Sequence, residues 1–249
     1  MKGLFLIGIG TGNPDHVTLQ AIRAINAADV ILIPRKGPDK ADLAELRERI
    51  LAAVLTNKAA RLVPFDLPVR DVANPDYQAG VAAWHDAIAG AWVAALSPYS
   101  DANDVALLVW GDPSLYDSTL RIGARLDPAP QVTVIPGISA PQVLAAAHHI
   151  TLNTVGRPYL TTTGRRLRDH GWPEGAETLV VMLDGDCAFQ TLDPAGLTIW
   201  WGAYVGMTEE ILDHGPLAEA GPRIVATRAL ARAAHGWIMD IYVLRKDAT

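Results

Sequence analysis

Short continuous apolar runs alternate with longer segments of helical spacing in the first half of the chain. Runs such as 4–7 and 105–110 are bounded by glycine, which is typical of buried strands. In 81–96 the apolar residues, two tryptophans among them, recur every three or four positions and predict a helix whose stripe packs in the core. This alternation favours a sheet rich in parallel strands. Strands are expected at 4–7, 30–33, 105–110 and 132–135, and helices at 17–27, 41–55, 81–96, 120–126 and 141–149.

The pattern changes after residue 119, where the apolar runs become denser. Strands bunched in this way suggest a mixed sheet that is partly antiparallel. We therefore expect an α/β protein with two α/β domains, residues 1–113 and 114–249, and a boundary near the turn at 111–117. In the second domain, strands are expected at 179–183, 197–201, 224–227 and 237–244, after a short strand-like run at 158–160.

Three glycine-rich turns each follow one of the apolar runs. They span Gly8–Pro14, Gly111–Tyr116 and Pro136–Ala140. Glycine lets a ligand approach the backbone closely, and the ligands of open α/β sheets lie beyond the carboxyl ends of the strands. The turns therefore predict one composite pocket built mostly from backbone amides and carbonyls.

The first turn also admits a dinucleotide interpretation. The Rossmann fingerprint needs G-x-G-x-x-G, whereas the third glycine here, Gly12, comes one position early and is followed by Asn13-Pro14. An NAD-dependent Rossmann oxidoreductase stays an alternative of a different class. A nucleotide-sensing module without turnover, or a tight turn without any ligand, are the others.

The order and the residue motifs of the three turns resemble those of the tetrapyrrole methylases, the S-adenosylmethionine-dependent C-methyltransferases of corrin synthesis. The family opens with G-x-G-x-G-x-P, here Gly8–Pro14, and carries a G-D-P turn, here Gly111–Pro113. A P-G-x-S turn follows at Pro136–Ser139, and the resemblance continues nearly to the last residue. It implies two α/β domains with the methyl donor bound in the cleft between them.

The resemblance also implies which residues bind the methyl donor. This chain departs from the family where methionine comes one place early, at Met182 and not Leu183, and where tyrosine replaces threonine at Tyr204. Asp112 and Ser139 could instead cap local turns, and Thr227 could be an ordinary threonine at a strand end. The implied cofactor-binding residues are Gly111, Asp112, Pro113, Ser114, Leu115, Tyr116, Ser139, Ala140, Met182, Leu183, Ala203, Tyr204 and Thr227.

Segments 110–119, 161–167 and 200–204 are most similar to a deacetylating subgroup of the family. That resemblance implies methylation of precorrin-5 at C1, coupled to the release of acetate. Another precorrin C-methyltransferase or a diphthine synthase are the alternatives within the family. Methyl transfer needs mainly proximity and the exclusion of water, whereas deacetylation needs an activated water. The candidates for activating it, which lie in or beside two glycine turns, are Asp15, His16, Tyr116 and Asp117.

The resemblance also implies that a tetrapyrrole substrate, which carries many acid side chains, faces the first turn. Arginine binds carboxylates through two parallel hydrogen bonds, although two arginines beside a glycine could equally form a solvated edge. The substrate-binding candidates are Gly10, Gly12, Pro14, Arg35, Lys36, Arg157 and Arg165.

Composition indicates which binding partners and which cellular compartment are compatible with the chain. The net charge of −6, from 21 basic and 27 acidic residues, argues against nucleic acid or an anionic membrane as a partner. A single cysteine, Cys187, permits no intrachain disulfide framework and fits a reducing, cytoplasmic setting. The N-terminal apolar run is too short to span a membrane and lacks a signal-peptide pattern. Adjacent His148 and His149 diverge on a helix, and no H-x-x-x-H or C-x-x-C occurs, so we expect no metal. A homodimer is expected from the resemblance.

Overall fold

The computed structural model describes residues 1–35, 41–71, 73 and 75–247. It contains two compact units, Met1–Ser139 and Ala140–Thr249. Each unit has one sheet with its own helices, so the expectation of two α/β domains is confirmed. The division falls later than the expected boundary after residue 113, because strand β5 (Gln131–Ile135) pairs with β1 (Gly3–Gly8) and completes the first sheet.

The first unit is built on a five-stranded sheet in which all neighbours are parallel, in the order β3-β2-β4-β1-β5. Its three central strands read as near-continuous apolar runs because both faces of the sheet are covered there. The remaining strands are β2 (Val30–Arg35), β3 (Arg61–Asp66) and β4 (Asp104–Val109).

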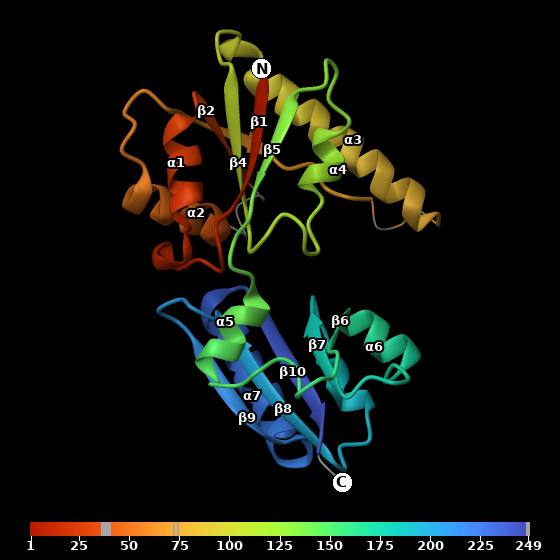
Figure 1. Ribbon diagram of the computed structural model, residues 1–249. Helices are drawn as coiled ribbons and strands as arrows, with labels where there is room; N and C mark the ends of the chain where they lie inside the picture. The colour runs from red at the N-terminus through yellow and green to blue at the C-terminus, as the bar shows by residue number, and fades with distance from the viewer. Residues whose placement is uncertain (36–40, 72, 74, 248–249) are drawn as a thin grey trace. The chain divides into compact units, whose positions relative to one another are not determined.

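Helices cover both faces of this sheet (Figure 1). On one face, α1 (Leu19–Ala27) and α2 (Ala41–Val54) pack against Ile7, Ile31 and Leu108. On the other face lie α3 (Tyr77–Leu96) and α4 (Thr119–Gly123). Two short 3-10 helices, η1 (Pro14–His16) and η3 (Ser97–Tyr99), connect these elements.

Helix α3 carries the tryptophan stripe predicted from the sequence. Its segment Tyr77–Tyr99 is long and apolar enough to cross a membrane by length and composition alone. In the structure, Ile88, Ala89 and Trp92 of this helix are buried against the sheet, and Trp84 is partly buried beside them. The stripe therefore forms core packing, as expected.

The second unit has a five-stranded mixed sheet in the order β6-β7-β10-β8-β9. The pair β6–β7 is parallel and the other pairs are antiparallel, which confirms the expected mixed sheet. The strands are β6 (Leu160–Thr163), β7 (Thr178–Met182), β8 (Leu197–Ala203), β9 (Ile211–Pro216) and β10 (Asp240–Lys246).

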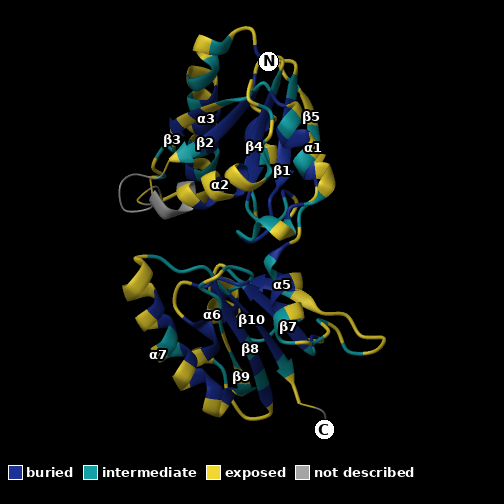
Figure 2. Ribbon diagram, turned by 90° about the vertical axis from the view of Figure 1, so that its left-hand side faces the viewer, coloured by how far each residue is buried: buried dark blue, intermediate teal, exposed yellow. Residues whose placement is uncertain are grey.

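Two cores hold the helices of the second unit to its sheet. Val143 and Leu144 of α5 (Ala140–Ala147) pack with Val180 and Val243 on one face. A larger core joins the other face to α7 (Leu217–His235), α6 (Gly164–His170) and η4 (Ala188–Thr191). The central strands β7, β10 and β8 are largely buried, whereas the outer faces of the helices are exposed (Figure 2).

The strand expected at 224–227 is wrong, because these residues lie inside helix α7. The run Ile224-Val225-Ala226-Thr227 contains β-branched residues, which favour strands locally. The buried positions of the helix, among them Leu217, Ala220, Ile224 and Ala231, instead recur every three or four residues. Packing of this buried helical face against the rest of the unit has overridden the local preference for a strand. Thr227 is therefore a partly buried helical residue, and it follows no strand.

Candidate functional site

The three glycine-rich turns meet in the first unit. They follow β1, β4 and β5, which are adjacent parallel strands, so their carboxyl ends share one edge of the sheet. Gly111 N donates to Gly10 O at 2.8 Å and Gly10 N donates to Gly111 O at 3.3 Å. Gly137 N donates to Asp112 Oδ2 at 2.9 Å and joins the third turn to the second. The structure thus brings the turns together, as the sequence predicted.

Side chains are excluded where these turns touch. A Cβ added at Gly137 would lie 2.1 Å from Gly111 O, and one added at Gly8 would lie 2.6 Å from Gly137 N. Backbone atoms cannot move aside as a flexible side chain can. Gly111 differs, because its Cβ would meet only Ser139 at 3.5 Å, yet its φ of +62° lies in the left-handed region that favours glycine.

Asp112 ties two of the turns together through its carboxylate. Besides the bond from Gly137, it accepts hydrogen bonds from Ser114 N at 2.8 Å and from the Ser114 hydroxyl. Burial would raise the pKa of Asp112, but the hydrogen bonds from Ser114 and Gly137 outweigh it and hold the pKa below its ordinary value. The carboxylate is thus a charged structural link at neutral pH.

The structure places the other donor-binding candidates at recognisable points of each unit. In the first unit, Gly111–Tyr116 follow β4 and Ser139, which is 8% exposed, ends the third turn. In the second unit, β7 and β8 both run antiparallel to β10, so their carboxyl ends lie at one edge of the sheet. The second-unit candidates at this edge are Met182, Leu183, Ala203 and Tyr204, while Ala140 begins α5.

Three of these candidates adopt a left-handed backbone that is rare outside glycine. Tyr116, Leu183 and Tyr204 each have a φ of 52°. Such strain persists where the surrounding structure imposes it, and it clusters at ligand sites. Leu183 is 66% exposed at the end of β7. Tyr204 is buried instead, and its hydroxyl donates to Trp237 O at 2.6 Å, so only its backbone is available to a ligand.

A buried polar network, which sequence reasoning missed, fixes the turn after β7. Asp184 Oδ2 accepts hydrogen bonds from Ala188 N and from the Tyr242 hydroxyl, both at 2.6 Å. Burial and the nearby Asp184 carboxylate hold the pKa of Tyr242 well above its ordinary value, so the hydroxyl keeps its proton. Arg228 Nη2 donates to Asp184 O at 2.9 Å, and its Nε donates to Asp240 Oδ2 at 2.8 Å. The network joins residues far apart in the chain, so no local sequence pattern pointed to it.

The four water-activating candidates divide between two turns of the first unit. Asp15 is exposed, and His16 lies beside Gly10 with its Nδ1 buried and without a hydrogen-bond partner among the described residues. Tyr116 is 46% exposed, and partial burial raises its pKa. Asp117 accepts hydrogen bonds from Thr119 N at 2.6 Å and from the Thr119 hydroxyl. These contacts fix the carboxylate of Asp117.

The substrate-binding candidates divide between the two units. Gly10 and Gly12 lie in the first turn with φ values of 73° and 112°, and Pro14 begins η1. Arg35 is exposed at the end of β2. Lys36 lies outside the described residues. In the second unit, Arg157 Nε lies 3.3 Å from Glu177 Oε1, and Arg165 lies in the first turn of α6.

In the part of the chain that the structure describes, no three histidine, cysteine, aspartate or glutamate side chains gather into a group that could hold a metal ion.

Comparisons with known proteins identify the family that this chain resembles along most of its length. A family model described as Tetrapyrrole (Corrin/Porphyrin) Methylases matches residues 3–221. A Precorrin-6A synthase [deacetylating] from Sinorhizobium sp is 50% identical over 253 residues, spanning all of this chain and 97% of the relative. A crystal structure of a putative cobalamin synthesis related protein (CobF) from Corynebacterium diphtheriae superposes with a TM-score of 0.82 at 36% identity, and all of both chains is covered.

A more distant structure shares the fold. It is a uroporphyrin-III C-methyl transferase from Thermus thermophilus complexed with S-adenyl homocysteine, with a TM-score of 0.58 at 19% identity. The match covers 97% of this chain and 96% of that one.

Proposed function

The chain belongs to the tetrapyrrole (corrin/porphyrin) methylases, and we propose that it acts as a deacetylating precorrin-6A synthase. It is an S-adenosylmethionine-dependent methyltransferase of cobalamin biosynthesis. Its reaction methylates precorrin-5 at C1, releases acetate and gives precorrin-6A. The observation that carries this proposal is the 50% identity to a deacetylating precorrin-6A synthase along the whole chain.

The residues around the glycine turns fit the methyl donor. S-adenosylmethionine supplies a methyl group on an electrophilic sulfonium. Its amino, carboxyl and ribose hydroxyl groups suit exposed backbone amides and carbonyls, and Gly111 leaves open the space that a Cβ would fill. In the first unit, the residues that would hold it are Gly111, Asp112, Pro113, Ser114, Leu115, Tyr116 and Ser139.

In the second unit we propose Ala140, Met182, Leu183, Ala203 and Tyr204 as further donor-binding residues. The left-handed backbones at Leu183 and Tyr204 support this assignment. The network of Asp184 and Arg228 holds the turn that contains Leu183 in place. Thr227 receives no such support, because it lies within α7.

The chain's own contribution is mainly to bind, orient and exclude water. Precise placement of two reactants removes much of the entropic barrier to their reaction, and closed surroundings keep solvent from competing. Deacetylation additionally needs a group that takes a proton from water. Asp15, His16, Tyr116 and Asp117 are the candidates, and the contacts from Thr119 that fix the Asp117 carboxylate support that residue.

The tetrapyrrole is a small-molecule substrate, and we propose that Gly10, Gly12 and Pro14 face it. Its carboxylates would be docked by Arg35, Lys36, Arg157 and Arg165, with Arg157 exchanging its contact to Glu177 for the substrate. We also propose a homodimer that works in the cytoplasm without nucleic acid or membrane as a partner. The net charge of −6 supports the absence of nucleic acid and membrane partners, and the single reduced cysteine supports a cytoplasmic setting.

Product analysis tests the proposal. Purified enzyme is incubated with precorrin-5 and S-adenosylmethionine in ¹⁸O-labelled water. We expect one acetate and one S-adenosylhomocysteine per turnover, with the label in the acetate, because hydrolysis of the acetyl carbonyl takes an oxygen from water. A methylated product that keeps its acetyl group would limit the assignment to the family. Binding of NAD in place of S-adenosylhomocysteine would favour an oxidoreductase.

A further inference from the structure

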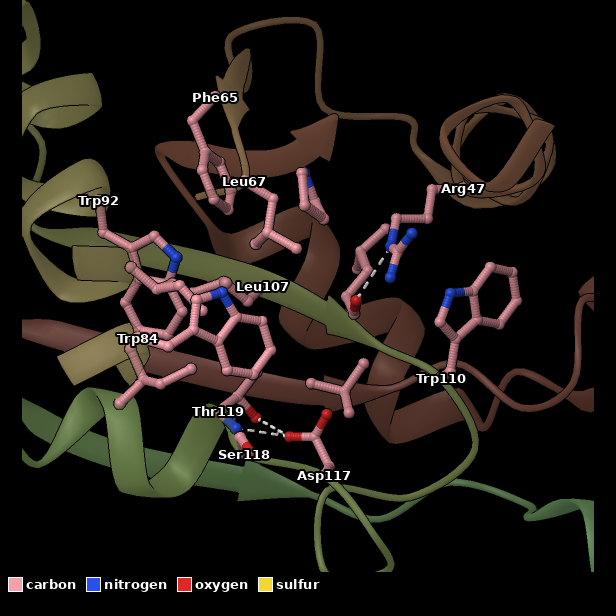
Figure 3. A pocket seen from close by; sticks show the side chains of 15 residues that line it. Arg47, Phe65, Leu67, Trp84, Trp92, Leu107, Trp110, Asp117, Ser118 and Thr119 are labelled. Carbon is pink, nitrogen blue, oxygen red and sulfur yellow. Dashed lines mark hydrogen bonds between the residues drawn. The ribbon is translucent and has the colours of Figure 1, made fainter. Parts of the chain in front are cut away.

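The first unit contains a cavity of about 200 Å³ at the carboxyl ends of β2, β3 and β4 (Figure 3). Phe65, Trp84 and Trp92 form an apolar wall. Arg47 from α2 and Asp117 from the turn after β4 supply charged groups to the lining. None of the proposed donor-binding or substrate-binding residues lines this cavity, which therefore has no assigned ligand.

Two buried indole N–H groups belong to residues of the lining. The indole Nε1 atoms of Trp92 and Trp110 are buried and have no hydrogen-bond partner among the described residues. Trp92 is only 1% exposed. Nearly all buried polar groups are paired in native proteins, so each exception calls for an explanation such as a bound ligand. The neighbouring Trp84 shows the usual arrangement, because its Nε1 donates to Pro68 O at 2.7 Å.

A buried cation adds to these donors. Arg47 is 9% exposed, its Nε donates to Leu108 O at 3.2 Å, and its guanidinium carbon lies 4.9 Å from the Trp110 ring centroid. Burial lowers the pKa of Arg47 to about 10, partly offset by the charge of Asp117, so Arg47 is cationic at neutral pH. The cavity thus combines apolar walls with positive and donor groups, which suits a small apolar body carrying an acceptor oxygen.

Asp117 is the candidate base that faces this cavity. One of its carboxylate oxygens is held by Thr119, and Figure 3 shows the other turned away from Thr119. Asp15, His16 and Tyr116 do not belong to the lining. The cavity therefore singles out one of the four water-activating candidates.

Resting on the proposed function, we propose that this cavity binds the acetyl group that the tetrapyrrole loses, and then the acetate formed from it. The methyl end of the group packs against Trp84, while its carbonyl oxygen accepts a hydrogen bond from the unpaired indole N–H of Trp92. Arg47 supplies a positive charge to the same cavity. Asp117 takes a proton from a water molecule beside the carbonyl carbon.

The chemistry balances with water as the co-reactant. The water oxygen bonds to the acetyl carbonyl carbon, and the carbon–carbon bond to the macrocycle breaks. The electron pair of that bond stays on the macrocycle, where it is available for methylation. One water proton passes to Asp117 and on to solvent, and the other leaves with the acid, which ionises to acetate at neutral pH.

An acid side chain of the same substrate offers similar chemistry to the cavity. A carboxylate arm would be held for docking and would not be cleaved. The two occupants differ in what they do to the kinetics: losing a docking contact raises KM, whereas losing a contact to the reacting group lowers kcat.

Acetate binding to the protein alone is the first test. Sodium acetate is titrated at constant ionic strength and followed by saturation-transfer NMR of its methyl group. We expect saturable binding that weakens by about tenfold in Trp92→Phe, which removes the unpaired N–H. The matched control is Trp172→Phe in the second unit, whose Nε1 donates to Ala176 O at 2.8 Å and which should bind acetate as the wild type does. Absence of saturable binding to the wild type would overturn the proposal, whatever the stability of the variants.

Turnover with precorrin-5 is the second test. The acetyl assignment predicts that Trp92→Phe slows acetate release by about tenfold, while KM for the tetrapyrrole changes little. A raised KM with unchanged kcat would place an acid side chain in the cavity and overturn the assignment, as would unchanged kinetics. If the wild type releases no acetate at all, the proposed function fails. If it does, and Trp92→Phe matches it, only this inference fails.

Discussion

Individual glycines in the turns carry different constraints. At Gly8 and Gly137, a Cβ would overlap backbone atoms of the neighbouring turns. At Gly111 the only constraint inside the protein is a φ of +62°. Replacement of Gly111 therefore tests whether the turn binds the ligand, whereas replacement of Gly137 tests whether the turns can still pack together.

We expect Gly111→Ala to fold and to lose affinity for S-adenosylhomocysteine by at least about tenfold, because the new Cβ occupies ligand space. Gly156→Ala is the matched control, since Gly156 has a φ of +71° and a Cβ there would meet no atom within 4 Å. Both replacements should cost about 1–2 kcal/mol of stability for a left-handed alanine. Calorimetric titration and thermal melting measure the two effects separately.

Equal ligand affinity in the two variants would remove Gly111 from the donor site. A Gly111→Ala protein that melts far below Gly156→Ala would instead show that the turn itself cannot accept a side chain.

Cys187 is expected to be unreactive in the native protein. It is 6% exposed, and burial raises its pKa from 9.0 to about 11. Iodoacetamide at pH 8 should label it far more slowly than in urea, because the thiolate is the nucleophile. The stability contributed by the protonated thiol is fully present below pH 9 and is lost as the pH rises from 9 to about 11. Labelling as fast as in the unfolded chain would contradict this.

At the scale of elements, apolar patterning predicted most of the first unit. Continuous runs such as Val30–Ile33 and Val105–Val109 are strands because their sheet is buried on both faces. Strands β3 and β9 were missed because exposed residues alternate with more buried ones, and because Asp213, His214 and Gly215 are weak strand formers. These strands depend on their partners in the sheet more than on their own sequence.

The sequence predicted only those parts of the candidate site that are formed by residues next to one another in the chain. Each glycine turn is a contiguous motif, and the parallel order of the strands brings the turns together. The cavity and the buried network are different, because Arg47, Trp92 and Asp117, or Asp184 and Arg228, meet only through the fold. Single-sequence reasoning has no signal for such long-range contacts.

The buried ion pair that links α7 to β10 should be important for stability. The side chains of Arg228 and Asp240 are 10% and 7% exposed. Asp240→Asn removes the charge that compensates Arg228 and should destabilise the protein by roughly 3 kcal/mol in urea unfolding. The matched control, Asp101→Asn, breaks the exposed pair with Arg61, where Asp101 is 73% exposed, and should change little. Similar midpoints for both variants would contradict the structural role of the pair.

At the scale of the whole molecule, each of the two units forms around its own sheet. We expect that neither unit needs a metal ion for the reaction. We predict that exhaustive dialysis against EDTA leaves both S-adenosylhomocysteine binding and turnover unchanged, because methyl transfer and hydrolysis are assigned to backbone groups and side chains. A loss of activity that zinc or magnesium restores would overturn this. Unaltered circular dichroism after dialysis serves as the control for the fold.

The contact between Gly8 and Gly137 also has a genetic consequence. Any missense change in a glycine codon introduces a residue with a Cβ. At these two positions that atom meets backbone at less than 3 Å, so even alanine, the smallest possible step, overlaps the neighbouring turn. Mutation therefore has no gradual route away from glycine there. New substrate specificities in this scaffold should arise by drift in the tryptophan-lined cavity and in exposed loops, while these two codons stay fixed under selection.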